Sequence, residues 1–130
     1  MQRQDQLWYH AVWGTKHRKP LLQVDHFKAI AVTCAEREDE WQFHLEAVNG
    51  IEDHVHVLIQ IHPSQPVAKV IGWIKGASSH AFGEAFEWQS GYSIVTISPA
   101  EVPLIKEYIL DQPKHHQEES LIDQLELQRH

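Results

Sequence analysis

The chain has 130 residues, of which 42% are hydrophobic, and its 18 acidic residues outnumber 11 Lys and Arg to give a net charge of −7. This length suits one domain over residues 1–130, and the apolar content excludes global disorder. No apolar run reaches the roughly 20 residues of a membrane helix, the N-terminus lacks the apolar core of a signal peptide, and a single cysteine excludes intrachain disulfides, so we expect a cytoplasmic protein without membrane contact.

The first third of the chain predicts a strand followed by a helix. Residues 7–13 read as a strand that ends at Gly14, where a basic loop over residues 16–19 begins. Apolar residues then recur at helical spacing, which predicts a helix over 25–39 with Asp25 as its N-cap.

Two alternating segments in the middle of the chain predict a β-hairpin. In the first strand the apolar positions that should share one face are Trp41, Phe43, Leu45 and Ala47. Asn49-Gly50 predicts the tight turn between the strands. In the second strand the positions that should face the core are Val55, Val57, Ile59 and Ile61.

The last third predicts a helix, a strand and another helix. Apolar spacing indicates a helix over 66–82 capped by Ser64, and residues 88–97 read as a strand interrupted at Gly91. Ser98 should cap the final helix and Pro99 should begin it, and this helix should end or kink at Pro113. A further amphipathic turn is expected near residues 121–125.

The element order is therefore β-α-β-β-α-β with one more helix at the C-terminal end. This order is typical of an α+β, ferredoxin-like fold, in which one antiparallel sheet carries helices on one face, here with an added C-terminal helix that bears Tyr108. Because such a fold hosts many functions, the function has to be argued from particular side chains.

A pair of histidines opens the strand predicted after the turn. His54 and His56 lie two residues apart, so they share one face of the strand with their Cα atoms about 7 Å apart, and their rings can converge on one cation. The alternative is a polar, solvated sheet face. A His-x-His pair also occurs in zinc hydrolases, so the motif does not specify one chemistry by itself.

One of the three tyrosines lies on the final predicted helix. Tyr9 and Tyr92 fall on predicted strands, where a tyrosine usually packs, whereas Tyr108 lies on this helix. Gln112 follows four residues later and is therefore its neighbour on one helical face. The alternative is an amphipathic helix with a half-buried tyrosine.

These motifs, in this order, resemble the single-tyrosine HUH transposases of IS200-like insertion sequences, a family that includes REP-associated tyrosine transposases. His54-Val55-His56 matches the histidine–apolar–histidine motif of that family, and Tyr108 with Gln112 matches its Tyr-x-x-x-Gln pattern. The segment 88–92 also resembles the family, as does an opening block made of Tyr9, His10, Trp13, Thr15, Lys16 and Arg18. The resemblance spans about residues 7–117.

The resemblance implies an enzyme, a metal-dependent endonuclease and strand transferase of single-stranded DNA. Tyr108 would attack a phosphodiester to give a 5′-phosphotyrosine and a free 3′-hydroxyl, and strand transfer would reverse this step. His54, His56 and Gln112 would hold one Mg²⁺ or Mn²⁺ ion, and we expect Mn²⁺ to bind more tightly because imidazole favours it. The implied partners are DNA hairpins at the element ends and a second copy of the chain in a homodimer.

The acidic net charge argues against DNA binding, but the charge is unevenly distributed. Residues 117–130 form an acidic tail in which four acidic residues against Arg129 give −3, which leaves −4 for the rest. The basic loop, through Lys16, Arg18 and Lys19, is expected to contact phosphates, and Lys75 on the second helix is expected near a DNA hairpin. The alternative for each is a solvated surface residue.

Two other functions stay open at the level of sequence. A hydrolase would bind zinc through His54 and His56 and use an activated water as nucleophile, so it would not need Tyr108. A non-catalytic module, domesticated from a transposase, would bind nucleic acid or another partner without needing the histidines or the tyrosine. The acidic charge makes the second of these alternatives credible.

Overall fold

The computed structural model describes residues 7–113 and contains the expected order of elements. The strands are β1 (Trp8–Gly14), β2 (Phe43–Ile51), β3 (His54–Ile61) and β4 (Ser93–Ile97). The helices are α1 (Val24–Trp41), α2 (Val67–Phe82) and α3 (Val102–Leu110), with short 3-10 turns η1 (Lys16–Arg18) and η2 (Pro99–Glu101). The α+β class and the ferredoxin-like order are confirmed. The acidic tail over 117–130 and the turn expected near 121–125 lie outside the described residues.

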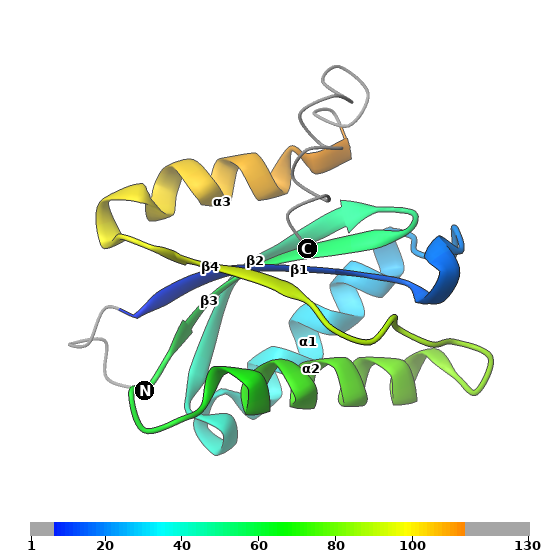
Figure 1. The fold of residues 1–130 in the computed structure, drawn as a ribbon, viewed down its shortest axis with the longest axis horizontal. Coiled ribbons are helices and arrows are strands. Elements are labelled where there is room, and N and C mark those ends of the chain that lie inside the picture. Colours follow the sequence, from blue (N-terminus) through cyan, green and yellow to red (C-terminus); the bar gives the residue numbers. More distant parts are fainter. Residues whose placement is uncertain (1–6, 114–130) are drawn as a thin grey trace.

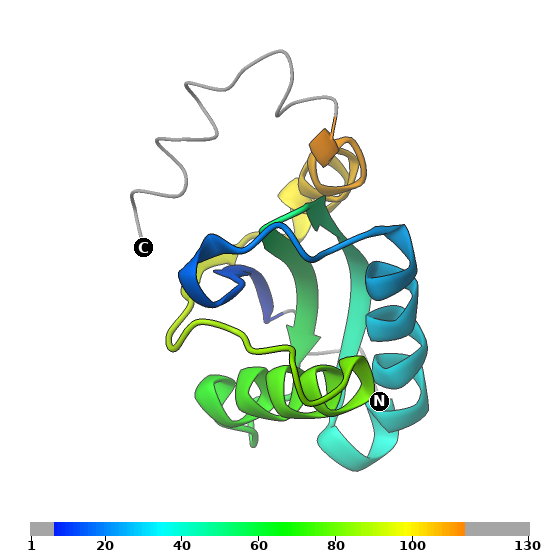
Figure 2. The same ribbon diagram turned by 90° about the vertical axis from the view of Figure 1, so that its right-hand side faces the viewer.

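The four strands form one antiparallel sheet in the order β2-β3-β1-β4. Helices α1 and α2 cover one face of this sheet, and α3 lies across the other face (Figure 1 and Figure 2). The central strand β3 is therefore covered from both sides, and all eight of its residues are buried.

The main core lies between the sheet and the two helices α1 and α2. The four β3 residues expected to face the core are at most 1% exposed, which confirms their orientation. They share a cluster with residues of both helices, namely Phe27, Ile30, Val70, Ile71 and Ile74. Burying one such side chain contributes about 1.5–3 kcal/mol, so this cluster sets the register of β3 and with it the face on which His54 and His56 lie.

A smaller cluster seats α3 on the second face of the sheet. Its buried members are Trp8, Ala47, Leu58, Ile97 and Ile109. Tyr108 packs against this cluster from α3, together with Val102 and Ile105.

The alternation predicted for the first strand of the hairpin is wrong at two of its four positions. Trp41 closes α1, and Ala47 belongs to the cluster under α3, whereas Phe43 and Leu45 face α1 and α2. The physical reason for the second error is a β-bulge between Leu45 and Ala47, where the register with β3 shifts by one residue. A bulge inserts an unpaired residue, here Glu46, and thereby moves the following side chains to opposite faces.

The tight turn predicted at Asn49-Gly50 is also wrong. Both residues continue β2, where Gly50 pairs with Val55, and the hairpin turns at residues 52–53 instead. Gly50 has another role, because a Cβ atom there would collide with the carbonyl oxygen of His54. The glycine therefore permits the close approach of strands β2 and β3 and does not form a turn.

Several element ends differ from the expected ones. The N-cap of α1 is Gln23, in a reciprocal capping arrangement with His26, and α2 begins after Pro66, so Asp25 and Ser64 are not caps. Strand β4 is shorter than expected because it begins at residue 93. These ends depend on which backbone donors the tertiary structure leaves unsatisfied, and local sequence does not reveal this.

The start of the final helical segment agrees with its sequence. Ser98 and Glu101 form the expected cap, in which the Ser98 amide donates to Glu101 Oε1 at 3.1 Å. Helix α3 ends at Leu110, before Pro113. Within residues 7–113, none of the helices combines the length and hydropathy that crossing a bilayer requires.

Candidate active site

The two histidines of the predicted motif lie at the centre of the sheet, on the face that α3 covers. His54 and His56 are each about 1% exposed. Each is flanked on both sides, since His56 pairs with Val12 of β1 and Asn49 of β2. The alternative of a solvated sheet face is therefore wrong, because α3 and the neighbouring strands enclose this part of the sheet.

An aspartate orients the first histidine. The Nδ1 atom of His54 lies 3.0 Å from Asp53 Oδ1, which also accepts a hydrogen bond from Arg18 Nη2 at 3.1 Å. Burial alone would raise the pKa of Asp53, but the hydrogen bonds from His54 and Arg18 outweigh it and lower this pKa to about 2. Asp53 is thus an ionised acceptor for a proton on Nδ1 of His54, and in the neutral ring this arrangement leaves the lone pair on Nε2.

A third histidine, not assigned to the site from the sequence, contacts the second. His10 Nε2 of β1 lies 2.9 Å from His56 Nδ1, and both side chains are buried. The ring centroids of His10 and His54 each lie 5.1 Å from that of His56. Alternation in β1 could have placed His10 opposite the core face of Ala11 and Trp13, but its proximity to His56 requires knowing that β1 and β3 are neighbours.

Tyr108 reaches this row of imidazoles from α3. Its ring centroid lies 6.1 Å from that of His56 and 6.3 Å from that of His10, with interplanar angles of 74° in both pairs. This edge-to-face arrangement is typical of favourable aromatic contacts. The structure therefore brings a phenol and two imidazoles together within one chain, from a helix and two strands that are distant in sequence.

The side chain of Gln112 is buried, polar and without a hydrogen-bond partner among the described residues, as a metal ligand in the absence of its ion would be. Its side chain is fully buried, and neither amide atom has a hydrogen-bond partner among the described residues. An unsatisfied buried amide is costly unless another group completes it. This orphaned amide, added to two imidazoles, fits a divalent cation of intermediate softness. Among residues 7–113, no three His, Cys, Asp or Glu side chains are grouped to hold an ion, so an amide oxygen is a fitting third donor.

Two polar contacts hold α3 on β2, beside its apolar face. Lys106 Nζ lies 2.8 Å from Glu46 Oε2, and Asn49 Nδ2 donates to the carbonyl oxygen of Leu110 at 2.9 Å. The hydrogen bond from Lys106 is the main reason that the pKa of Glu46 is lowered. The bulge in β2 places Glu46 where it reaches Lys106, so this irregularity helps to position the tyrosine helix.

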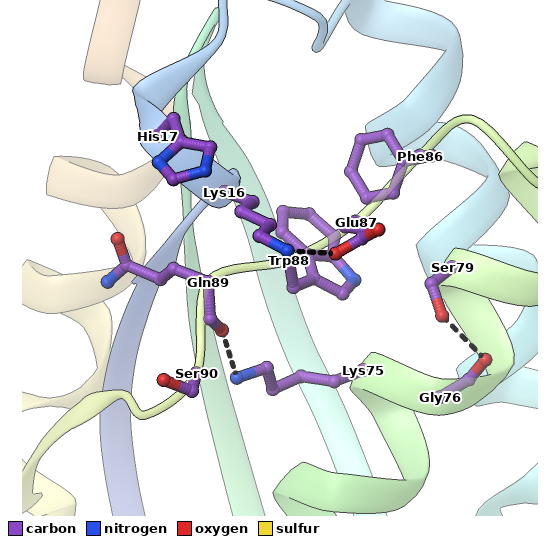
Figure 3. A pocket seen from close by; sticks show the side chains of 10 residues that line it. All are labelled: Lys16, His17, Lys75, Gly76, Ser79, Phe86, Glu87, Trp88, Gln89 and Ser90. Atoms are coloured by element: carbon purple, nitrogen blue, oxygen red, sulfur yellow. Dashed lines mark hydrogen bonds and ion pairs between the residues drawn. The ribbon is translucent and has the colours of Figure 1, made fainter.

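The residues expected to bind DNA fall into separate places. Lys16 and Lys75 line one groove of about 740 Å³ together with the segment 86–90 (Figure 3). The Lys16 side chain extends into this groove from η1, and that of Lys75 from α2. Arg18 instead pairs with Asp53 beside His54, and Lys19 is exposed next to a smaller hollow. The backbone at Arg18 and the preceding residue is left-handed, with φ of 56° and 59°, an uncommon conformation for non-glycine residues.

Both lysines of this groove already have partners. Lys16 Nζ lies 2.8 Å from Glu87 Oε2, on the surface. Lys75 Nζ donates to the carbonyl oxygens of Gln89 and Gly91 at 2.8 and 2.9 Å, and burial lowers its pKa. Phe86 and Trp88 add aromatic surface to the groove. The groove therefore combines cationic and aromatic groups, which is the chemistry that single-stranded nucleic acids favour.

The sheet order, the helices on both of its faces and the enclosed histidine pair place the chain among ferredoxin-like α+β proteins with a site under an added helix. Residues 3–112 match the family described as "Transposase IS200 like". The chain belongs to this IS200-like transposase family. The predicted resemblance is thereby confirmed.

Individual relatives agree with this assignment. The chain is 29% identical to the ISDra2 transposase TnpA of Deinococcus radiodurans, in a match that covers 82% of this chain and 84% of the relative. It is 27% identical to the transposase for insertion sequence element IS200 of Salmonella typhimurium, covering 85% of this chain and 77% of the relative.

A solved structure of a REP-associated tyrosine transposase bound to a REP hairpin has the same fold. Its TM-score is 0.67 at 18% identity, over 85% of this chain and 68% of that one. A crystal structure from Deinococcus radiodurans R1 has a TM-score of 0.62 at 23% identity, over 83% and 92%. At such identities the likeness concerns the fold alone.

Proposed function

We propose that this transposase cleaves and rejoins single-stranded DNA through a 5′-phosphotyrosine on Tyr108, with one divalent ion, Mg²⁺ or Mn²⁺. The observation that carries the proposal is the position of Tyr108, whose ring lies edge-to-face against both His56 and His10 of its own chain. A tyrosine that served only to pack α3 would not require a row of buried imidazoles beneath it.

The residues present suit this reaction. The Tyr108 oxygen would form a bond to phosphorus while the bond between phosphorus and the 3′ oxygen breaks. The phenol loses its proton and the departing 3′ oxygen gains one. One phosphoester bond replaces another, so the bond energy is conserved and no ATP is needed.

The ion would be held by neutral donors. His54 and His56 would ligate through Nε2, and Gln112 through its amide oxygen. A bound cation in such a site polarises the scissile phosphate and stabilises charge that develops on it. Free tyrosine has a pKa of about 10, so assistance of this kind matters at neutral pH. Because the ligand set carries no charge, binding without DNA should be weak, with Mn²⁺ preferred over Mg²⁺.

The DNA would follow the cationic groove. Lys16 and Lys75 line it, Lys19 lies exposed beside it, and Arg18 stands next to Asp53 at the edge of the histidine site. Since a structural relative holds a REP hairpin, we extend this kind of partner, a DNA hairpin at the element ends, to the present chain. A homodimer is part of the proposal, although Tyr108 here faces the histidines of its own chain.

The test is covalent capture. Protein, Mn²⁺ and single-stranded oligonucleotides that carry candidate element ends should give a species that resists denaturant and migrates slowly in a gel. Tyr108→Phe should give none, whereas Tyr9→Phe is the matched control, because Tyr9 packs on the main core at the opposite face of β1. An adduct that persists in Tyr108→Phe would overturn the proposed nucleophile.

A non-catalytic module, domesticated from a transposase, is the second candidate, and the observation behind it is the net charge of −7, which opposes the DNA affinity that catalysis requires. The same experiment separates the two functions. The module predicts a DNA complex that dissociates in denaturant and that forms equally well with wild type and Tyr108→Phe.

A further inference from the structure

We propose that His10 is a positioning residue that holds His56 in the tautomer able to bind a cation. This inference rests on the proposed function, because it concerns how His56 is prepared for its ligand role. His10 itself is not a ligand in this proposal. It acts through the hydrogen bond between its Nε2 and the Nδ1 of His56, at 2.9 Å.

Only one of the two possible proton arrangements in this bond is compatible with metal binding. Two neutral ring nitrogens at this distance share one proton. If His10 donated, the proton of His56 would lie on Nε2, and that atom would have no lone pair for a cation. If His56 donates from Nδ1 and His10 accepts at Nε2, the lone pair of His56 lies on its own Nε2. The proposal therefore commits to His56 as donor and His10 as acceptor.

The neighbouring histidine is oriented in the same sense by a different kind of acceptor. His54 donates from Nδ1 to the ionised Asp53, at 3.0 Å, and so also presents Nε2. The two rings lie side by side on one strand, with centroids 5.1 Å apart. With a hydrogen-bond acceptor at Nδ1 of each ring, both histidines keep the lone pair on Nε2, the atom that each would offer to a shared cation.

A neutral acceptor behind His56 has an electrostatic consequence. Asp53 carries a negative charge that Arg18 balances at 3.1 Å. A second carboxylate in the place of His10 would add an anion beside the position of a scissile phosphate. His10 can orient His56 without that repulsion, and its burial, with 9% exposed, keeps water from competing for the hydrogen bond.

His10 also contacts the Tyr108 ring, with centroids 6.3 Å apart, so the experiment must separate packing from hydrogen bonding. His10→Phe keeps an aromatic ring and removes the acceptor. His10→Gln loses the ring but keeps an acceptor oxygen at about the reach of Nε2. A packing role predicts that Phe is the better substitute, whereas the positioning role predicts that Gln is.

The first measurement uses the apoprotein. Nitrogen-15 spectra of the histidine rings should show the proton of His56 on Nδ1 in wild type and in His10→Gln, and should lose this preference in His10→Phe. A wild-type spectrum with the proton on Nε2 overturns the proposal, even if His10→Phe proves too unstable to study. This readout needs neither DNA nor activity, so it is independent of whether the proposed reaction occurs.

The second measurement is Mn²⁺ affinity by calorimetry, on samples whose thermal unfolding shows that they are folded. Loss of an orienting partner typically weakens metal binding by about 10–100-fold, and we expect this for His10→Phe. His10→Gln should stay within about threefold of wild type. Equal affinity in wild type and His10→Phe would overturn the proposal. Failure of the reaction itself would appear separately, as absence of the covalent DNA adduct in wild type.

Discussion

Gln112 combines a cost in stability with a benefit in binding, which makes it a sensitive probe of the site. A buried amide without a partner destabilises a fold by about 1–3 kcal/mol relative to an apolar group of similar shape. Gln112 is fully buried, and neither of its amide atoms has a partner within the described residues. We therefore expect Gln112→Met to raise the free energy of unfolding by this amount while weakening Mn²⁺ binding.

Urea denaturation and calorimetry measure the two effects of Gln112→Met separately. Gln65→Met is the control, because Gln65 is only half-buried and lies outside the site, so it should change neither quantity appreciably. A clear loss of stability in Gln112→Met would indicate that Gln112 is a structural residue with partners of its own, and would remove it from the proposed ligand set.

At the residue scale, the sequence predicts those site residues that a local pattern carries. His54 and His56 stand out because alternate positions of a strand share a face, and the structure places them together. The role of His10 could not be predicted in this way. It follows from the pairing of β1 with β3 across 46 residues of sequence separation, and local spacing contains no information on that pairing.

Among the elements, the attachment of α3 to β2 is the most informative, because α3 carries Tyr108. Lys106 and Glu46 connect the two across 2.8 Å, and the lowered pKa of Glu46 means that its carboxylate is more stable in the fold than in the unfolded chain. A lowered folded pKa contributes stability above the unfolded value, about 4.3, and this contribution disappears as the pH falls through the folded pKa.

The expected result is that Lys106→Met reduces the free energy of unfolding at pH 7 by about 0.5–1 kcal/mol, since Lys106 keeps substantial exposure. This difference should vanish as the pH falls below the ordinary glutamate value of about 4.3 and then through the lowered pKa of folded Glu46, because Glu46 is then protonated in both proteins. Urea unfolding at pH 7 and in acid measures it. Lys28→Met, at an exposed position of α1, changes the net charge by the same amount. It therefore measures the part of the effect that comes from the net charge of the chain alone. A deficit that persists in acid would show that Lys106 acts by packing alone.

An element can be predicted from the sequence when it is determined by residues close to one another in the chain. Within residues 7–113, periodicity located the four strands and the three helices, because it reports which face is buried. The bulge at Glu46 and the turn at residues 52–53 were missed. Both depend on contacts between strands, including the close approach at Gly50, and Asn49-Gly50 is a strong turn signal that the tertiary structure overrides.

For the whole molecule, the decisive feature is a sheet that is used on both faces. The face toward α1 and α2 is an apolar core, whereas the face toward α3 holds histidines among apolar neighbours. The first face supplies the stability that lets the second keep buried polar groups such as Gln112. The sequence predicted α3 and its tyrosine. The packing of α3 against Trp8 and Leu58 could be seen only in the structure.

Charge at the scale of the whole molecule also has to be reconciled with DNA binding. A net charge of −7 repels DNA at long range, so any affinity must come from local cations. Lys16 is the clearest of these, because it lines the groove and is held by one exposed carboxylate, Glu87, whose pKa it lowers. DNA phosphate and Glu87 should therefore compete for the same ammonium group.

Competition predicts opposite effects from two substitutions at one ion pair. Lys16→Met should weaken binding to a single-stranded oligonucleotide and should reduce the slope of log affinity against log salt by about 0.7, the value for one phosphate contact. Glu87→Gln should strengthen binding, since Lys16 is then released from its partner. Fluorescence anisotropy over a series of salt concentrations measures both.

Lys28→Met matches Lys16→Met in net charge but lies outside the groove, so its salt slope should equal that of wild type. If Lys28→Met and Lys16→Met behave alike, only the overall charge matters and the groove is not the DNA path.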